Sequence, residues 1–135
     1  MTSPAWNAWR EIGGGGRNRP RHIEEHMQES LVAWFGLQYP EYALLLHHSP
    51  NGGKRSAEEG RRFKLMGTRA GFPDLILLLP RHGYAYLCIE LKTDKGRQSD
   101  TQRAYQHAGE ANGGRYEVVR DFDTFRTLIQ DYLHD

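Results

Sequence analysis

The chain has 135 residues, of which 38% are hydrophobic and 26% are charged, and its formal net charge is +1. These values are typical of one soluble globular domain that is long enough for a single core and not for two. No apolar run approaches the roughly 20 residues that a membrane helix needs, and no signal peptide is recognisable. The single cysteine, Cys88, excludes an intramolecular disulfide and fits a reducing compartment.

The positive charges are unevenly placed along the chain. One group precedes an apolar hairpin at 71–91, another lies near the N-terminus, and the segment from Asp121 onward is acidic. Such a distribution permits a polyanion to approach one side of the molecule, although solvated helix faces explain it equally well. The first group consists of Lys54, Arg55, Arg61, Arg62, Lys64 and Arg69, and the second of Arg17, Arg19 and Arg21.

The first half of the chain alternates between helical and extended patterns. Residues 1–21 contain GGGGRNRPR and are expected to form a flexible, basic, Gly-rich arm. Helical spacing of apolar residues predicts a helix over 22–37, which Pro40 ends. YALLLHH at 42–48 predicts a short strand, and 56–66 predicts a basic helix.

The second half predicts a sheet and its covering helices. Apolar strands at 74–79 and 84–91 are joined by the turn PRHG. Ser99 is a good N-cap for a helix to about Ala111, RYEVV gives a last strand, and Asp121 or Asp123 caps a final helix. The order α–β–(α)–β–β–α–β–α predicts an α/β domain over 22–135, with a mixed four-stranded sheet flanked by helices.

Three charged residues interrupt the apolar hairpin. Glu90 and Lys92 face the same way because strand side chains alternate, and strand pairing brings Asp74 beside them. Two carboxylates and a backbone carbonyl form a hard-oxygen site that Mg²⁺ accepts, and a lysine can stabilise negative charge on a reacting phosphate. The pattern therefore indicates phosphodiester hydrolysis. A strand-capping aspartate and an ordinary ion pair at the rim of the sheet would use the same residues.

The wider sequence supports the catalytic interpretation. GFPD…IELK resembles the PD-(D/E)xK nuclease signature, and SPNGGKR…GTRAGFPDLILLLPRHGYAYLCIELKTDKGRQSDTQ resembles the VRR-NUC (virus-type replication-repair nuclease) family, particularly its stand-alone phage and bacterial members. The resemblance runs from about Glu24 to Leu133. It implies a PD-(D/E)xK nuclease-like core, a Mg²⁺- or Mn²⁺-dependent endonuclease acting on DNA, and a place in the cytoplasm of a bacterial or phage-infected cell.

The resemblance also implies roles for individual residues of the hairpin and the next helix. Asp74 and Glu90 would bind the metal, with the Leu91 carbonyl as a third ligand, and Lys92 would be the catalytic lysine. Gln102, in SDTQ, matches the glutamine that such nucleases carry on the helix after the E-x-K strand. Without the family, Gln102 would be an ordinary polar residue of an amphipathic helix.

Two further family positions lie outside the hairpin strands. Glu24, with Gln28, matches the acidic residue and glutamine of the first helix, where the carboxylate would be another metal ligand. The neighbouring Glu25 and Glu29 leave the register of that helix open. Gly71 fits the family glycine two residues before the Pro-Asp pair.

The expected partner is DNA. Phosphate contacts without base reading suit a structure-selective enzyme. Stand-alone relatives are associated with homodimers that cleave branched DNA such as four-way junctions, so both properties are expected from the resemblance alone. A flap or linear duplex as substrate, and a non-catalytic DNA-binding module, remain alternatives, and no membrane or protein partner is predicted. The expected DNA contacts are Lys54, Arg55, Arg61, Arg62 and Lys95.

Two other features suggest sites on first inspection. Cys88 shares a strand face with Glu90, but a cysteine in mid-strand is usually a buried hydrophobe, and hard cations do not favour sulfur. His47 and His48 followed by Asn51 resemble ββα-metal nucleases faintly. No second ligand histidine follows on a helix, so this interpretation is set aside.

Overall fold

The computed structural model describes residues 19–50 and 56–135. Most of the predicted arm, together with Lys54 and Arg55, lies outside these ranges. The first described helix, α2, spans Arg19–Gln38 and so begins three residues before the predicted start at His22. Pro20 is compatible with this earlier start because the first turn of a helix needs no backbone N–H donors. None of the helices in the described ranges is long and apolar enough to cross a membrane.

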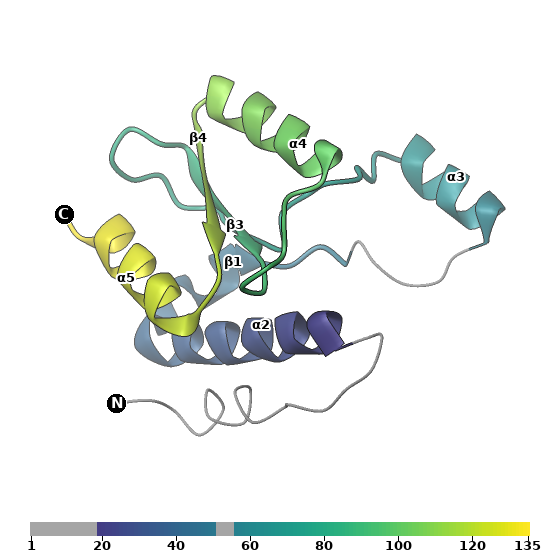
Figure 1. Ribbon diagram of the computed structural model, residues 1–135. Coiled ribbons are helices and arrows are strands. Elements are labelled where there is room, and N and C mark those ends of the chain that lie inside the picture. The colour runs from purple at the N-terminus through teal and green to yellow at the C-terminus, as the bar shows by residue number, and fades with distance from the viewer. Residues whose placement is uncertain (1–18, 51–55) are drawn as a thin grey trace.

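A mixed sheet forms the centre of the described structure (Figure 1). Within the described residues it has four strands in the order β1-β2-β3-β4. β1 pairs antiparallel with β2, β2 antiparallel with β3, and β3 parallel with β4, which confirms the predicted mixed sheet. The strands are β1 Leu46–His47, β2 Leu75–Leu77, β3 Tyr86–Leu91 and β4 Gly114–Val119.

Helices cover both faces of this sheet (Figure 1). α2 and α5, Phe122–Leu133, lie on one face, and α4, Asp100–Ala111, lies on the other. α3, Ala57–Leu65, has no buried residue and stands apart from the sheet, on the side where α4 begins. The predicted helices after residue 50 are therefore confirmed to within one or two residues.

The larger part of the core lies between the sheet, α2 and α5. Met27, Leu31 and Phe35 recur every four residues, so they form one buried stripe on α2. α5 contributes an apolar face that includes Phe125 and Tyr132, both with no exposed surface. Each large apolar side chain buried here contributes about 1.5–3 kcal/mol to stability. A smaller cluster of Ile76, Cys88 and Tyr116 faces α4.

The segment at 42–48 differs from the prediction of a strand. Pro40–Leu45 form a 3-10 helix, η1, and only Leu46 and His47 join the sheet. Pro40 fixes a backbone angle that suits a first helical turn, and the Tyr42 N–H donates to the Tyr39 carbonyl at 2.9 Å. Tyr42 and Leu45, three residues apart, pack on the core, whereas Leu44 is exposed. The apolar spacing is therefore that of a tight helix and not of a strand.

The hairpin and the caps agree more closely with prediction. Its strands are shorter than the expected 74–79 and 84–91, because the chain leaves the β2–β3 ladder after Leu77 and rejoins it at Leu87. Tyr86, the first residue of β3, pairs with β4 instead. Ser99 is the N-cap of α4, and Asp121 rather than Asp123 is the N-cap of α5. Both side chains accept a hydrogen bond from the backbone N–H three residues later.

The loop before β2 touches the first turn of α4 at Gly71. Its φ is +84°, a conformation that strongly favours glycine. A Cβ at this position would overlap the Thr101 carbonyl and lie 2.7 Å from the Gln102 nitrogen. Only a residue without a side chain therefore lets the segment that leads to Asp74 lie against the start of α4.

We expect Gly71→Ala to destabilise the protein more than Gly67→Ala. Gly67 also has a positive φ, of +110°, but a Cβ there would meet nothing within 4 Å. Gly67→Ala should therefore cost only the backbone strain, about 1–2 kcal/mol, whereas Gly71→Ala adds steric overlap of about 1–3 kcal/mol. Urea unfolding of both variants measures the difference, and equal losses would show that the contact with α4 does not matter.

Candidate active site

Asp74 stands where three segments of the chain meet. It follows the buried Pro73 and directly precedes β2. Its Oδ2 accepts a hydrogen bond from the Leu91 backbone N–H at 2.7 Å, so the carboxylate is tied to the end of β3. Its backbone carbonyl lies 2.7 Å from His48 Nδ1, just beyond β1. Because a carbonyl can only accept, the Nδ1 of His48 carries the proton in this contact.

Glu90 is a buried carboxylate with a partner for each oxygen. The residue is 2% exposed. Its Oε1 accepts from Gln102 Nε2 at 2.8 Å, and its Oε2 accepts from the Tyr116 hydroxyl at 2.9 Å. Lys92 Nζ lies 4.0 Å from Oε1. Burying a charge this deeply is costly without hydrogen bonds and a counter-charge, and these three groups supply part of that compensation.

The compensation for the Glu90 charge is incomplete. Burial, followed by the neighbouring Asp74 carboxylate, raises the pKa of Glu90 to about 8, against the opposing effects of Tyr116 and Lys92. Two carboxylates placed together in a poorly hydrated position repel each other. A cation between them would remove this repulsion, so the electrostatics of the pair favour a positively charged ligand.

Gln102 is oriented by the cap of α4. Its Oε1 accepts from the Ser99 backbone N–H at 2.8 Å, and its own backbone N–H donates to Ser99 Oγ at 3.2 Å. This reciprocal capping box engages the carbonyl end of the side-chain amide, so the NH₂ end points at Glu90. The same first turn of α4 also receives Gly71, which links the supports of Asp74 and Glu90.

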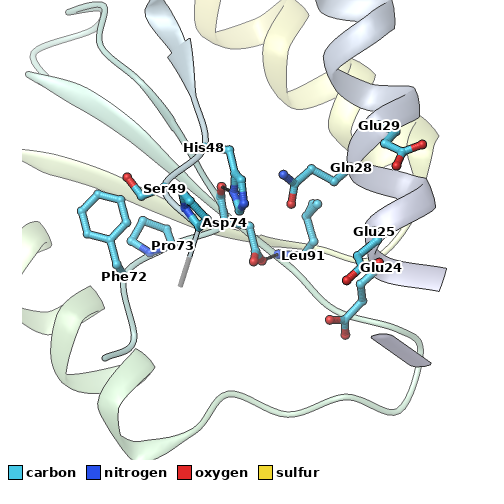
Figure 2. Close-up of a pocket in the computed structure, with 11 residues that line it drawn as sticks. Glu24, Glu25, Gln28, Glu29, His48, Ser49, Phe72, Pro73, Asp74 and Leu91 are labelled. Carbon is cyan, nitrogen blue, oxygen red and sulfur yellow. Dashed lines mark hydrogen bonds between the residues drawn. The ribbon is translucent and has the colours of Figure 1, made fainter. Parts of the chain in front are cut away.

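A cavity of about 420 Å³ opens beside Asp74 (Figure 2). Asp74 and Leu91 form one wall, and the first turns of α2 form the opposite wall. Glu90 and Lys92 are not among the residues that line the cavity. The lining residues are Glu24, Glu25, Gln28, Glu29, His48, Ser49, Pro50, Phe72, Pro73, Asp74 and Leu91.

On α2, the structure brings Glu24 to the site more closely than Glu25. Burial raises the pKa of Glu24, the nearby Lys92 opposes this rise, Asp74 reinforces it, and a hydrogen bond with the Thr93 backbone opposes it. Glu24 is half-buried and interacts with Lys92 and Asp74, whereas Glu25 is exposed. Gln28 points toward His48 and Asp74, and Glu29 points away from them (Figure 2).

Three residues to which the sequence analysis gave no role in this site support it. His48 contacts the Asp74 carbonyl and lines the cavity. Tyr116 contacts Glu90. Arg120 Nη1 donates to the carbonyls of Thr93 at 2.7 Å and Gly96 at 2.8 Å, which holds the loop after Lys92. Arg120 directly follows β4, and Lys92 directly follows β3. Because these two strands are parallel neighbours, their carboxyl ends lie at the same edge of the sheet, and a correct prediction of that pairing would have placed Arg120 near Lys92.

The predicted DNA contacts do not line the cavity. Arg61 and Arg62 are exposed on α3, and Lys95 is exposed on the loop after β3. Lys54 and Arg55 lie outside the described residues. Figure 1 shows α3 on the same side of the molecule as the first turns of α2 and α4, which border the candidate site.

The remaining sequence features divide between core and site. Cys88 is buried, and burial raises the pKa of its thiol to about 12, so it packs as a hydrophobe. In the described ranges no three His, Cys, Asp or Glu side chains are arranged to hold a metal ion by themselves. Metal binding here would therefore depend on Asp74 and Glu90, completed by a backbone carbonyl and water. Such a hard-oxygen set suits Mg²⁺ or Mn²⁺.

Comparison with known proteins gives consistent matches. Residues 21–122 match the sequence model of the VRR-NUC domain. A solved structure described as a "VRR_NUC domain protein" superposes with a TM-score of 0.72 at 28% identity, covering 82% of this chain and 87% of that chain. No curated protein matches the chain. The range matched by the domain model contains Asp74, Glu90, Lys92 and Gln102.

We expect the metal-free protein to lose stability as the pH rises from about 5 to about 8. The pKa of Glu90 is raised from 4.5 to about 8, so its contribution is complete below the lower value and is lost as the pH approaches the upper one. Glu90 alone accounts for a fall of at most about 1.4 kcal/mol per pH unit in the free energy of unfolding. The raised pKa of Glu24 acts in the same direction.

Denaturant unfolding of wild type and Glu90→Gln across this pH range measures the effect. The free energy of unfolding of the Glu90→Gln variant should fall less steeply with rising pH than that of wild type, because the buried amide does not ionise. Saturating Mg²⁺ should stabilise wild type more at about pH 8 than at about pH 5, since the ion binds the deprotonated carboxylate. Identical pH slopes for the two proteins would contradict the assignment of the shift to Glu90.

Proposed function

We propose that this member of the VRR-NUC domain family is a metal-dependent endonuclease that hydrolyses phosphodiester bonds in DNA. Because the chain belongs to this family, it carries a nuclease-type domain. The observation that carries the proposal is the convergence of Asp74, Glu90 and Lys92 at one edge of the sheet. Their spacing in sequence recurs by chance, but their arrangement in space places two carboxylates and an ammonium group around one poorly hydrated position.

The cost of this arrangement argues against a purely structural role. Glu90 is 2% exposed and sits beside a second carboxylate, so the pair destabilises the metal-free fold. An apolar pair at the same positions would avoid that cost. Perturbed carboxylates next to a cavity are a common property of catalytic sites. A DNA-binding module without catalysis has no use for them.

The donor set fits a divalent cation. Asp74 and Glu90 would hold it, with the Leu91 carbonyl as a further ligand and Glu24 approaching from α2. A bound Mg²⁺ or Mn²⁺ would supply Lewis-acid stabilisation of the reacting phosphate and would assist the ionisation of water.

The protein's own residues prepare the site in identifiable ways. The Leu91 N–H donates to the Asp74 carboxylate, and Gln102 donates to one oxygen of the Glu90 carboxylate. Lys92 is 14% exposed in its side chain and lies close to Glu90, so its ammonium group can stabilise negative charge that develops on a phosphate oxygen. The loop that follows Lys92 is held by Arg120, which limits the positions that Lys92 can take.

The cations outside the cavity suit a DNA backbone. Arg61 and Arg62 project from a helix with no buried residue, and Lys95 is exposed close to Lys92 in sequence. Charges of this kind bind phosphates without reading bases. We propose branched DNA, such as a four-way junction, as the substrate and a homodimer as the active form, since two sites related by a two-fold axis match the symmetry of a junction.

Lys92→Ala should lower the rate of DNA cleavage about 100- to 1,000-fold, because it removes a preorganised positive charge next to the reacting phosphate. The assay compares a synthetic four-way junction, a flap and a linear duplex with Mg²⁺ or Mn²⁺. Arg126→Ala is the matched control, since it removes a cation from α5 that pairs with Asp123. Its cleavage rate should equal that of wild type.

The three substrates separate the alternatives. Paired, symmetric nicks on the junction alone would support a junction-resolving enzyme. Cutting of the flap or the linear duplex instead would support the nuclease activity and contradict branched DNA as the substrate. If wild type binds DNA but cuts none of the substrates with either metal, the protein is a DNA-binding module and the proposed activity is wrong.

A double substitution, Arg61→Ala with Arg62→Ala, should weaken DNA binding without changing the maximal cleavage rate. Each lost phosphate contact should reduce the slope of log affinity against log salt by about 0.9 on duplex DNA. Fluorescence anisotropy at several salt concentrations measures this slope, and Arg126→Ala again serves as the control. An unchanged slope would remove α3 from the DNA-binding surface.

A further inference from the structure

Tyr116 occupies the middle of β4 and faces α4. It pairs in register with Cys88 of β3, and Glu90 lies two residues further along on the same strand face. Diagonal neighbours on adjacent strands are within reach of a long aromatic side chain. The Tyr116 hydroxyl uses this reach to contact Glu90 Oε2 at 2.9 Å, in a residue that is only 7% exposed.

The Tyr116 hydroxyl completes a two-point hold on one carboxylate. Gln102 donates to Oε1 from α4, and Tyr116 donates to Oε2 from β4. The last torsion of a glutamate side chain is soft, so a single hydrogen bond leaves the plane of the carboxylate free to rotate. Two donors on different oxygens fix that plane. The two donors also belong to different elements, α4 and β4, so a shift of one element leaves the other hydrogen bond in place.

Packing alone does not require a tyrosine at this position. Tyr116 lies in a small apolar cluster with Ile76 and Cys88, and a phenylalanine would fill the same space. Tyr105, on α4, packs against the same cluster and meets Phe72 edge-on at 5.1 Å between ring centroids. A buried hydroxyl is costly without a partner, and Tyr116 directs its hydroxyl at Glu90.

We propose that Tyr116 is a positioning residue that orients the Glu90 carboxylate for a divalent cation. The inference rests on the proposed function. It gives the Tyr116 hydroxyl on β4 the same task as the Gln102 amide on α4, which is to hold one oxygen of Glu90. Partners of metal-ligating groups fix ligand direction, and their loss costs about 10- to 100-fold in metal affinity. Tyr116 never meets the reacting phosphate in this role, because it acts through Glu90.

The test compares Tyr116→Phe with Tyr105→Phe. The two substitutions remove the same atom from the same cluster, but only the first removes a donor to Glu90. Mn²⁺ dissociation constants, measured by electron paramagnetic resonance on the full chain without DNA, should rise about 10- to 100-fold for Tyr116→Phe and stay at the wild-type value for Tyr105→Phe. Thermal unfolding without metal reports any general loss of stability in parallel.

Each outcome has a definite meaning. A lower melting temperature for Tyr116→Phe with unchanged Mn²⁺ affinity would make Tyr116 structural and overturn the inference alone. Wild type that binds no Mn²⁺ would overturn the proposed function itself. If Tyr116→Phe fails to fold, the buried hydroxyl proton of Tyr116 in wild type provides the readout by NMR. Its resonance should shift on saturation with Mg²⁺, and an unmoved resonance would also overturn the inference.

Discussion

Repulsion between the carboxylates of Asp74 and Glu90 is the constraint around which the rest of the site is arranged. Water would screen the two charges, but Glu90 is almost completely buried. The fold holds each carboxylate by groups that belong to different segments: a β3 backbone N–H for Asp74, and α4 and β4 side chains for Glu90. Because these groups are fixed by secondary structure, the pair cannot relax by moving apart. Such a pair would be a defect in an ordinary core, and the proposed function gives it a role as the binding site of a cation.

Much of this could be predicted from the sequence because the signals are local. Ser99 and Asp121 cap their helices through contacts three residues away, and the apolar runs of the hairpin predict β2 and β3 directly. Alternation along β3 places Glu90 on the face of Cys88, and the fold confirms it. The family and the fold class followed from these spaced motifs, and both are confirmed. The roles of the individual site residues remain predictions.

The parts that the sequence did not predict depend on contacts between distant segments. His48 reaches Asp74 across 26 positions, and Tyr116 reaches Glu90 across the same separation. The residues adjacent to His48 suggested a different kind of nuclease, and nothing adjacent to Tyr116 distinguishes it from other tyrosines. The segment at 42–48 was mispredicted for a related reason: an apolar run of that length fits a strand or a 3-10 helix, and Pro40 together with the packing of Tyr42 decides between them.

The parallel pairing of β3 with β4 also sets the order in which the molecule can assemble. β2 and β3 form a hairpin, which needs only a short loop to close, whereas β4 reaches β3 only after the chain has passed through α4. Such crossover pairings form more slowly than hairpins because a longer loop must close first. A chain that has folded only its hairpin holds Asp74 beside Glu90 but lacks both donors to Glu90. The hydrogen bonds that hold Glu90 are therefore complete only after α4 and β4 have docked on the hairpin.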